Sequence, residues 1–354
     1  MIKYRCKSKG CEIMKKIFKF FIRFFIIILV LTTGIFIFSY VSVYPSVWLT
    51  RMAFSQGKYT EHDDIELISS EVYVSKDYDY ESISSKNQFN IISPIENQKR
   101  YPTVIWVHGG AFVSGDKSGN ESYLKVLAHK GYTIINLNYQ YAPKAKYPMP
   151  IIQVSEVYQH LEKNIDLYPM VDLNQIILGG DSAGAHIIAQ FALIQTNPKY
   201  EALVNINKVM NKEQIKSILL YCGPYDFGLL KELLNPIGTS ILGQIIPFLS
   251  RRIGAAYLGD MKWDKNEKWD VLTIKNYVTK DFPKTFITDA KDYSFEEQGK
   301  QLAKVLEEKG VLVTKVFYDA NLAHEYQFNL GTKNEDGNNY ALMTFNQVIK
   351  FLEE

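Results

Sequence analysis

The pattern of apolar and polar positions divides the chain into an N-terminal apolar segment and a longer mixed region. Residues 24–43 are almost continuously apolar and uncharged, which is long enough for a helix that crosses a bilayer. From residue 102 onward, short apolar runs alternate with stretches at helical spacing. This alternation predicts an α/β fold, with a mostly parallel twisted sheet and helices on both faces.

Five apolar runs carry the strand prediction. They are residues 102–107, 175–179, 218–222, 284–288 and 311–318. Two shorter runs, 71–74 and 89–92, flank a polar region rich in Ser and Asp, which indicates an antiparallel edge of the same sheet. The chain is 47% hydrophobic, which is enough for one large core, so we predict a single domain over residues 45–354.

The charges at the N-terminus predict the orientation of the apolar segment. Residues 1–23 contain eight Lys or Arg against one acid, Glu12. A basic tail stays in the cytoplasm, so the domain that follows is expected on the extracytoplasmic side of a single-pass cell-membrane protein. We interpret residues 24–44 as an uncleaved signal anchor, because the segment is long for a signal peptide and no A-x-A-like site follows it. Secretion after cleavage is the alternative, and Met14 competes with Met1 as the start of the protein.

Charge and cysteine content exclude several kinds of site. Without the tail, 32 basic and 37 acidic residues remain, a net charge of −5, which argues against a nucleic-acid surface. Cys6 and Cys11 precede the apolar segment and Cys222 lies in a predicted strand, so no disulfide framework or metal-binding spacing is present. We therefore expect neither a metal nor a cofactor.

The sequence Gly-Asp-Ser-Ala-Gly at 180–184 follows one predicted strand and opens a predicted helix. Strand, sharp turn and helix are the context that makes a G-x-S-x-G motif a nucleophile elbow. The turn holds the Ser182 hydroxyl clear of the sheet, and Gly180 and Gly184 leave room where strand and helix meet. Ser182 is therefore the candidate nucleophile.

A second motif, His-Gly-Gly-Ala at 108–111, follows the predicted strand 102–107. Acyl transfer requires N–H donors for the oxyanion of the tetrahedral intermediate, and a donor of this type contributes about 10²–10³ in rate. Gly109, Gly110 and Ala111 are the candidate donors in this loop. The N–H of Ala183, directly after the nucleophile, would complete the oxyanion hole.

These motifs together resemble the α/β-hydrolase fold and, within it, the hormone-sensitive-lipase-like serine esterases. That group carries an HGGG-type motif before a GDSAG elbow, and a Y-R-L-A-P segment similar to 139–143 here. Ala111 replaces the third Gly but keeps its N–H. Gln140 and Tyr141 replace Arg and Leu of the second motif, so the match to the subfamily is incomplete there.

The acid of a triad should come next in the chain order Ser, acid, His. Asp289 and Asp292 both follow the predicted strand 284–288. Ser294 and Glu297 are spaced as a capping box at the start of a helix, which places Asp292 in the strand-to-helix loop. Family members carry the acid in a similar arrangement, so we favour Asp292 and keep Asp289 as the alternative.

The general base is expected after the last strand, and His324 lies in the loop that follows run 311–318. It would take the proton from the Ser182 hydroxyl and return it to the leaving alcohol. Its position, the chain order and the resemblance agree on this assignment.

A long insertion separates the predicted strands 218–222 and 284–288. Its apolar residues include Ile237, Ile241, Ile245, Ile246, Phe248 and Leu249. One interpretation is a helical subdomain that covers the core. The other is a lid or cap over residues 228–280, which lines an acyl pocket above Ser182, close to lipid.

The expected function is that of a membrane-anchored serine esterase of the carboxylesterase or lipase type. Its substrate would be a small-molecule or lipid ester, cleaved through an acyl-enzyme. An amidase or peptidase with the same triad is the alternative enzyme, because a fold does not determine the leaving group. The alternative that is not an enzyme is a membrane-tethered binding module whose elbow motif is a relic without catalytic function.

Overall fold

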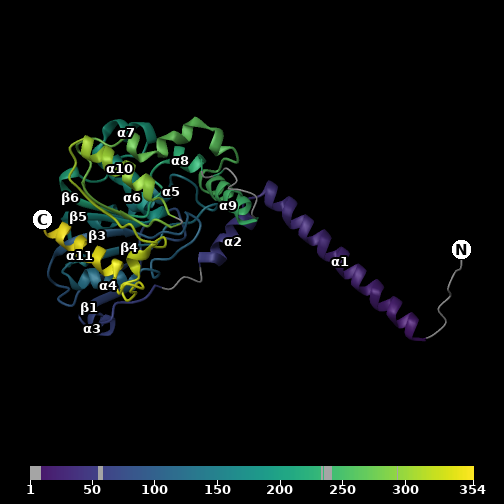
Figure 1. The fold of residues 1–354 in the computed structure, drawn as a ribbon. Coiled ribbons are helices and arrows are strands. Elements are labelled where there is room, and N and C mark those ends of the chain that lie inside the picture. Colours follow the sequence, from purple (N-terminus) through teal and green to yellow (C-terminus); the bar gives the residue numbers. More distant parts are fainter. Residues whose placement is uncertain (1–8, 55–58, 233, 235–240, 293) are drawn as a thin grey trace.

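The computed structural model describes residues 9–54, 59–232, 234, 241–292 and 294–354 (Figure 1). Its centre is an eight-stranded sheet with the order β1-β2-β4-β3-β5-β6-β7-β8. The strands are β1 (Val72–Asp79), β2 (Gln88–Pro94), β3 (Tyr101–Val107), β4 (Thr133–Leu137), β5 (Val171–Asp181), β6 (Ile215–Tyr221), β7 (Lys284–Asp289) and β8 (Val313–Phe317). β1 and β2 pair antiparallel with their neighbours, and all other pairs are parallel. The predicted mostly parallel sheet with an antiparallel edge is confirmed.

Helices cover both faces of the sheet because the strands are apolar on both sides. One face packs against α5 (Met149–Lys163), α6 (Ala183–Thr196) and α10 (Glu296–Glu308). The other face packs against α3 (Ile65–Ser70), α4 (Glu121–His129) and α11 (Tyr340–Glu353). Successive strand residues point to opposite faces, so Ile105 belongs to the first layer and Trp106 to the second.

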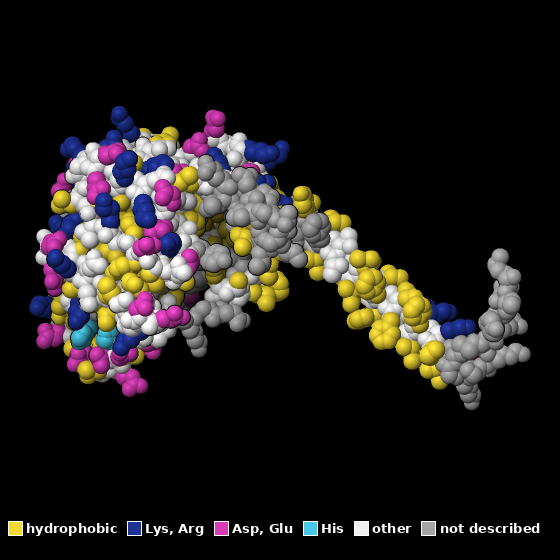
Figure 2. Space-filling view, viewed as in Figure 1, with side chains coloured by type: hydrophobic (Ala, Val, Ile, Leu, Met, Phe, Trp, Pro, Cys, Tyr) yellow, Lys and Arg dark blue, Asp and Glu magenta, His cyan; other side chains and the backbone are white. Residues whose placement is uncertain are grey.

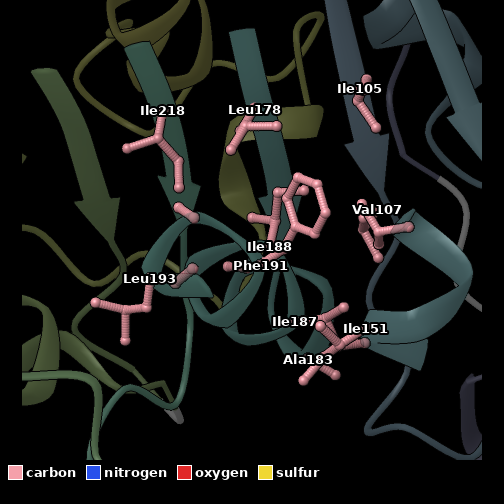
Figure 3. Close-up of a cluster of buried hydrophobic side chains, with 14 of the residues drawn as sticks. Ile105, Val107, Ile151, Leu178, Ala183, Ile187, Ile188, Phe191, Leu193 and Ile218 are labelled. Atoms are coloured by element: carbon pink, nitrogen blue, oxygen red, sulfur yellow. The ribbon is translucent and has the colours of Figure 1, made fainter. Parts of the chain in front are cut away.

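Helix α6 lies at the centre of the first layer. All of its residues are buried, and α5 and α7 (Pro198–Val204) pack beside it. Figure 3 shows Ile105 and Leu178 of the sheet on the side that faces Ile188 and Phe191 of α6. The helix that begins directly after Ser182 is thus held rigidly, which fixes the position of the nucleophile candidate.

The parallel strands end at one edge of the sheet, so their following loops meet there. These loops contain the Gly109-Gly110 turn after β3, Ser182 after β5, Cys222 after β6, residues 290–292 after β7 and His324 after β8. In open α/β sheets ligands bind outside this carboxyl edge. The candidate residues are therefore gathered by topology and not by sequence proximity.

The N-terminal apolar segment forms one continuous helix, α1 (Lys9–Val41), that projects from the domain (Figures 1 and 2). Within its part Glu12–Val41, the most apolar 18-residue window has a mean hydropathy of 2.6 and none of it is buried, so by length and composition the helix is able to cross a bilayer. Two residues separate it from α2 (Tyr44–Phe54), which packs on the domain. Residues 1–8 of the predicted tail 1–23 lie outside the described residues.

The insertion between β6 and β7 is helical. It contains α8 (Phe227–Glu232), α9 (Ile241–Leu258) and three short 3₁₀ helices, Trp263–Lys265, Glu267–Leu272 and Ile274–Asn276. Buried Tyr257, Trp263 and Leu272 join the core layer that contains α5 and α6. Ile237 lies outside the described residues.

Candidate active site

Ser182 sits at a strained turn between β5 and α6. Its backbone has φ 50° and ψ −121°, a conformation that a residue with a side chain rarely adopts, and its N–H donates to the carbonyl of Tyr221 at 2.8 Å. A Cβ at Gly184 would lie 2.0 Å from the Val107 carbonyl oxygen, so only glycine fits there. The turn has the geometry of a nucleophile elbow.

His324 reaches Ser182 from the loop after β8. Its Nε2 lies 2.9 Å from the Ser182 Oγ, across 142 residues of chain. Burial lowers the pKa of His324, which favours the neutral imidazole. A neutral ring can accept the Ser182 proton, so the pair has the geometry and charge state for general-base catalysis.

The carboxylate connected to His324 is that of Asp289 and not the predicted Asp292. His324 Nδ1 lies 2.6 Å from the Ser294 Oγ, and the Ser294 hydroxyl in turn donates to Asp289 Oδ1. Asp289 is buried, and burial raises its pKa to about 7. A chain of hydrogen bonds therefore runs from Ser182 through His324 and Ser294 to Asp289.

Asp292 meets the His324 loop through its main chain. Its N–H donates to the Leu322 carbonyl at 3.1 Å, and it forms a parallel bridge with Ala323, the residue before His324. Among the described residues its carboxylate makes no hydrogen bond to His324. Asp292 thus fastens the two loops through backbone contacts, and the residue is only half-buried.

Three potential metal ligands also meet here. Cys222 Sγ, an Asp289 carboxylate oxygen and a His324 ring nitrogen lie within 4.8 Å of one another. Burial raises the pKa of the Cys222 thiol well above its usual value, which disfavours the thiolate that binds metals. Both nitrogens of His324 are engaged by serine hydroxyls. The cluster therefore suits proton transfer better than metal binding.

The loop after β3 forms a tight turn beside Ser182. Gly110, Ala111 and Phe112 have φ values of 115°, 53° and 63°, and the N–H groups of Val113 and Ser114 both donate to the Gly110 carbonyl. The Gly109 N–H donates to Asp181 Oδ2 at 2.6 Å, so this predicted oxyanion donor is already engaged. The N–H groups of Gly110 and Ala111 have no acceptor within the described part of the chain, and Ala183 supplies the first N–H of α6.

A pair of carboxyl groups, which the sequence analysis did not identify, lies beside the nucleophile. Buried Asp181 accepts hydrogen bonds from Trp106 Nε1 at 2.8 Å, from Gly109 N and from Asn120 Nδ2 at 3.2 Å. The Glu325 carboxyl lies close to it, because a Cβ at Gly109 would meet Asp181 Oδ2 at 2.5 Å and Glu325 Oε1 at 2.7 Å. Burial, and secondly the Glu325 charge, raise the pKa of Asp181 well above its usual value.

Glu325, the residue after His324, also lines the site. It has a left-handed backbone with φ 63°, accepts a hydrogen bond from the Tyr59 hydroxyl, and places Oε1 3.8 Å from His324 Nε2. A Cβ at Gly109 would lie 2.7 Å from this oxygen. The signal for the pair was present in the sequence, since each acid directly adjoins a candidate catalytic residue.

With Glu325→Gln, the free energy of unfolding is expected to fall less steeply as pH rises. Because Asp181 holds a proton in the fold that it releases when unfolded, its contribution to the free energy of unfolding is full below a pH of about 4 and is lost as pH rises through its folded pKa. Glutamine removes the Glu325 charge, the second cause of the raised Asp181 pKa, so the pKa difference between the folded and unfolded states becomes smaller. Thermal unfolding across pH would measure the two slopes, with the exposed Glu297→Gln as control. Equal slopes for Glu325→Gln and the wild type would contradict the effect of the Glu325 charge on Asp181.

The candidate residues Ser182 and His324 line a cleft of about 670 Å³. Its walls are Arg51, Ala53 and Phe54 of α2, Tyr59, the loop from 108 to 120, Tyr141, and the residues Asp181, Ser182, His324 and Glu325. Within the described residues, none of the insertion 228–280 lines this cleft. Its Tyr257 instead stacks on Phe112 of the turn at 3.9 Å between ring centroids. Helix α2, and none of the described residues of the insertion, provides this part of the wall.

Comparison with known proteins gives a consistent picture. A family model described as BD-FAE matches residues 89–306. The acetyl esterase of Salmonella dublin is 26% identical over 210 residues, 58% of this chain and 59% of that protein. The putative alpha/beta hydrolase R526 of Acanthamoeba polyphaga mimivirus is 28% identical over 134 residues, 36% of this chain and 38% of that protein. The chain thus spans less than two-thirds of these curated relatives.

Solved structures resemble the fold over most of its length. Esterase B from Lactobacillus rhamnosis (HN001) superposes with a TM-score of 0.68 and 18% identity, covering 88% of this chain and 95% of that one. An esterase of Pyrobaculum calidifontis gives a TM-score of 0.63 and 16% identity, covering 87% and 92%. At these identities the likeness establishes the fold. Because the family model covers more than half of the chain, from β2 into α10, the protein belongs to the BD-FAE family and has the α/β-hydrolase fold.

Proposed function

We propose that the protein is a serine esterase held at a membrane by α1. The observation that carries the proposal is the 2.9 Å contact between Ser182 Oγ and His324 Nε2 at a strained elbow. The names of the curated relatives, among them acetyl esterases, support a carboxylic ester as the substrate.

The geometry supports the following sequence of steps. Ser182 Oγ attacks the ester carbonyl carbon while its proton passes to His324 Nε2. The resulting oxyanion is placed to accept hydrogen bonds from the N–H groups of Gly110, Ala111 and Ala183. His324 then protonates the leaving alcohol, which gives an acyl-enzyme. Water, deprotonated by the same nitrogen, releases the acid and restores Ser182.

The Ser294–Asp289 pair is proposed to orient His324 and stabilise its protonated form. The Nδ1–H group of His324 donates to the Ser294 hydroxyl, and that hydroxyl donates to the Asp289 carboxylate. His324 and Asp289 therefore make no direct contact in this arrangement, because the Ser294 hydroxyl lies between them. Asp292, favoured by the family resemblance, is the alternative acid, and substitution of both residues tests the choice.

A fluorophosphonate probe is expected to label the protein on Ser182 alone. The probe reacts with an activated serine, and Ser182 is the hydroxyl that contacts a histidine inside the cleft. Labelling should disappear in Ser182→Ala and persist in Ser118→Ala, whose hydroxyl lies in the same cleft and donates to Asp116.

A protein that the probe does not label would be a binding module and not a hydrolase.

For a protein that the probe labels, the rates of hydrolysis of p-nitrophenyl esters of increasing chain length, compared with those of the matching anilides, separate an esterase from an amidase. Faster cleavage of the anilides would overturn the esterase assignment.

A further inference from the structure

Helix α2 is fixed to the catalytic domain and lies directly beyond the end of α1. Ser46, Val47 and Thr50 are buried against the domain. The Arg51 guanidinium donates to the Val113 carbonyl at 2.6 Å and to the Ala142 carbonyl at 3.1 Å. These two carbonyls belong to the turn beside Ser182 and to the segment after β4. The position of α2 is therefore coupled to the wall of the active site.

The end of α1 is held by α9. The Arg252 guanidinium donates to the Tyr40 carbonyl, and the Phe248 ring lies 6.0 Å from the Tyr40 ring. Figure 1 places α2 and α9 on the side of the domain from which α1 departs. The direction of α1 relative to the domain is thus set by side-chain contacts as well as by the chain connection.

The outer surface of these two helices is apolar. We call it the α2–α9 face, and it consists of Tyr44, Trp48, Leu49, Met52, Ile245 and Ile246. Tyr44, Trp48 and Met52 are four residues apart and so share one side of α2. Their exposed fractions are 63%, 62% and 47%, which is unusual for large apolar side chains in water.

We propose that the α2–α9 face rests in the headgroup–acyl boundary of the bilayer that α1 spans, so that the catalytic cleft takes acyl esters from that bilayer. This rests on the proposed membrane anchor. Two observations favour a lipid surface over a protein partner. The face continues α1 after only two residues, and its Tyr and Trp are the residue types that concentrate at membrane interfaces. Such a helix lies in the plane of the interface with its apolar side buried.

The same helix connects this surface to the chemistry. Phe54, at the end of α2, is 54% exposed and also lines the cleft that contains Ser182. Ala53 and Arg51 line the cleft beside it. An acyl ester that leaves the bilayer at α2 therefore reaches the nucleophile past the apolar side chains of Phe54 and Ala53.

Tryptophan fluorescence tests the position of the face. Of the four tryptophans, Trp106, Trp263 and Trp269 are at most 8% exposed, whereas Trp48 is on the face, and α1 contains none. The full-length protein in phosphatidylcholine vesicles with brominated acyl chains should show quenched emission, with little quenching by aqueous iodide. Trp48→Phe should remove most of the bromine-sensitive signal.

Three different results would overturn the proposal. A protein that stays with the vesicles, but whose Trp48 is quenched by iodide and not by bromine, would leave the anchor in place and refute the docked face. A protein that does not float with the vesicles would refute the anchor as well. Capture of a protein partner that shields Trp48 in the absence of lipid would also contradict the proposal.

Activity provides a second measurement. The double substitution Trp48→Glu and Leu49→Glu should lower hydrolysis of vesicle-embedded acyl esters by about tenfold, because charged groups do not enter the acyl region. Hydrolysis of water-soluble p-nitrophenyl acetate should stay unchanged. Leu312→Glu is the matched control, since Leu312 is 73% exposed and precedes β8 at the opposite edge of the sheet. An equal loss on both substrates would indicate a folding defect and contradict the role of the face.

Discussion

Replacing Ser182 by alanine is expected to lower kcat/KM for esters by about 10⁴–10⁶-fold, with the fold unchanged. In the proposed mechanism Ser182 supplies the attacking oxygen, and the small alanine side chain fits the elbow as well as serine does. His324→Ala should cause a loss of the same order, because the Ser182 hydroxyl then has no base at 2.9 Å. The measurement is steady-state hydrolysis of a p-nitrophenyl ester by each purified variant.

The double variant tests whether the two residues act as a unit. It is expected to be little worse than either single variant, because each loss already removes the same step. Losses that multiply would show that the residues contribute independently. That result would contradict the proposed proton transfer from Ser182 to His324.

Asp289→Asn is expected to lower kcat/KM by about 10³–10⁴-fold, and Asp292→Asn by less than about tenfold. Asp289 is the carboxylate that the Ser294 hydroxyl connects to His324, whereas Asp292 holds the loop with its main chain, which asparagine preserves. Ser294→Ala should resemble Asp289→Asn, because it removes the connecting hydroxyl. Circular dichroism would check that the variants fold.

The pH profile adds an independent readout for Asp289. Its pKa is raised to about 7 by burial, so the carboxylate form, which stabilises protonated His324, is lost as pH falls through 7. The wild type should lose activity on this acidic side, and Asp289→Asn should lack that dependence. A larger loss for Asp292→Asn than for Asp289→Asn would identify Asp292 as the acid, as the family resemblance predicts.

The sequence predicted the features that depend on local order. The strands β3, β5, β6 and β7, the antiparallel edge and the elbow all follow from short apolar runs and glycine positions. β4 was not named, although its five residues are fully buried, because a short apolar run next to a helix is ambiguous. The choice between Asp289 and Asp292 depends on how the loop after β7 pairs with Leu322 and Ala323, which lie some thirty residues further along the chain.

Contacts between segments that are far apart in the sequence cannot be predicted from it for the same reason. Tyr59 and Glu325 are 266 residues apart, and no pattern in either segment indicates that they meet. No pattern in the sequence indicates the role of α2 in the cleft, because the runs 71–74 and 89–92 that follow it indicate only an antiparallel edge of the sheet. The apolar residues of the insertion suggested a cleft lining, but buried members such as Tyr257 and Trp263 join the core.

The two residues between α1 and α2 limit how far the domain can travel. An extended chain spans about 3.3–3.6 Å per residue, so Ser42 and Val43 allow a tether of only about 7 Å. With α1 in a bilayer, the domain can hardly move along the bilayer normal and diffuses only within the plane of the membrane. Its turnover would then depend on how many ester molecules occupy each unit of membrane area and not on their concentration in the surrounding solution. Esters in another membrane, or dissolved away from the surface of this one, would remain beyond the reach of Ser182.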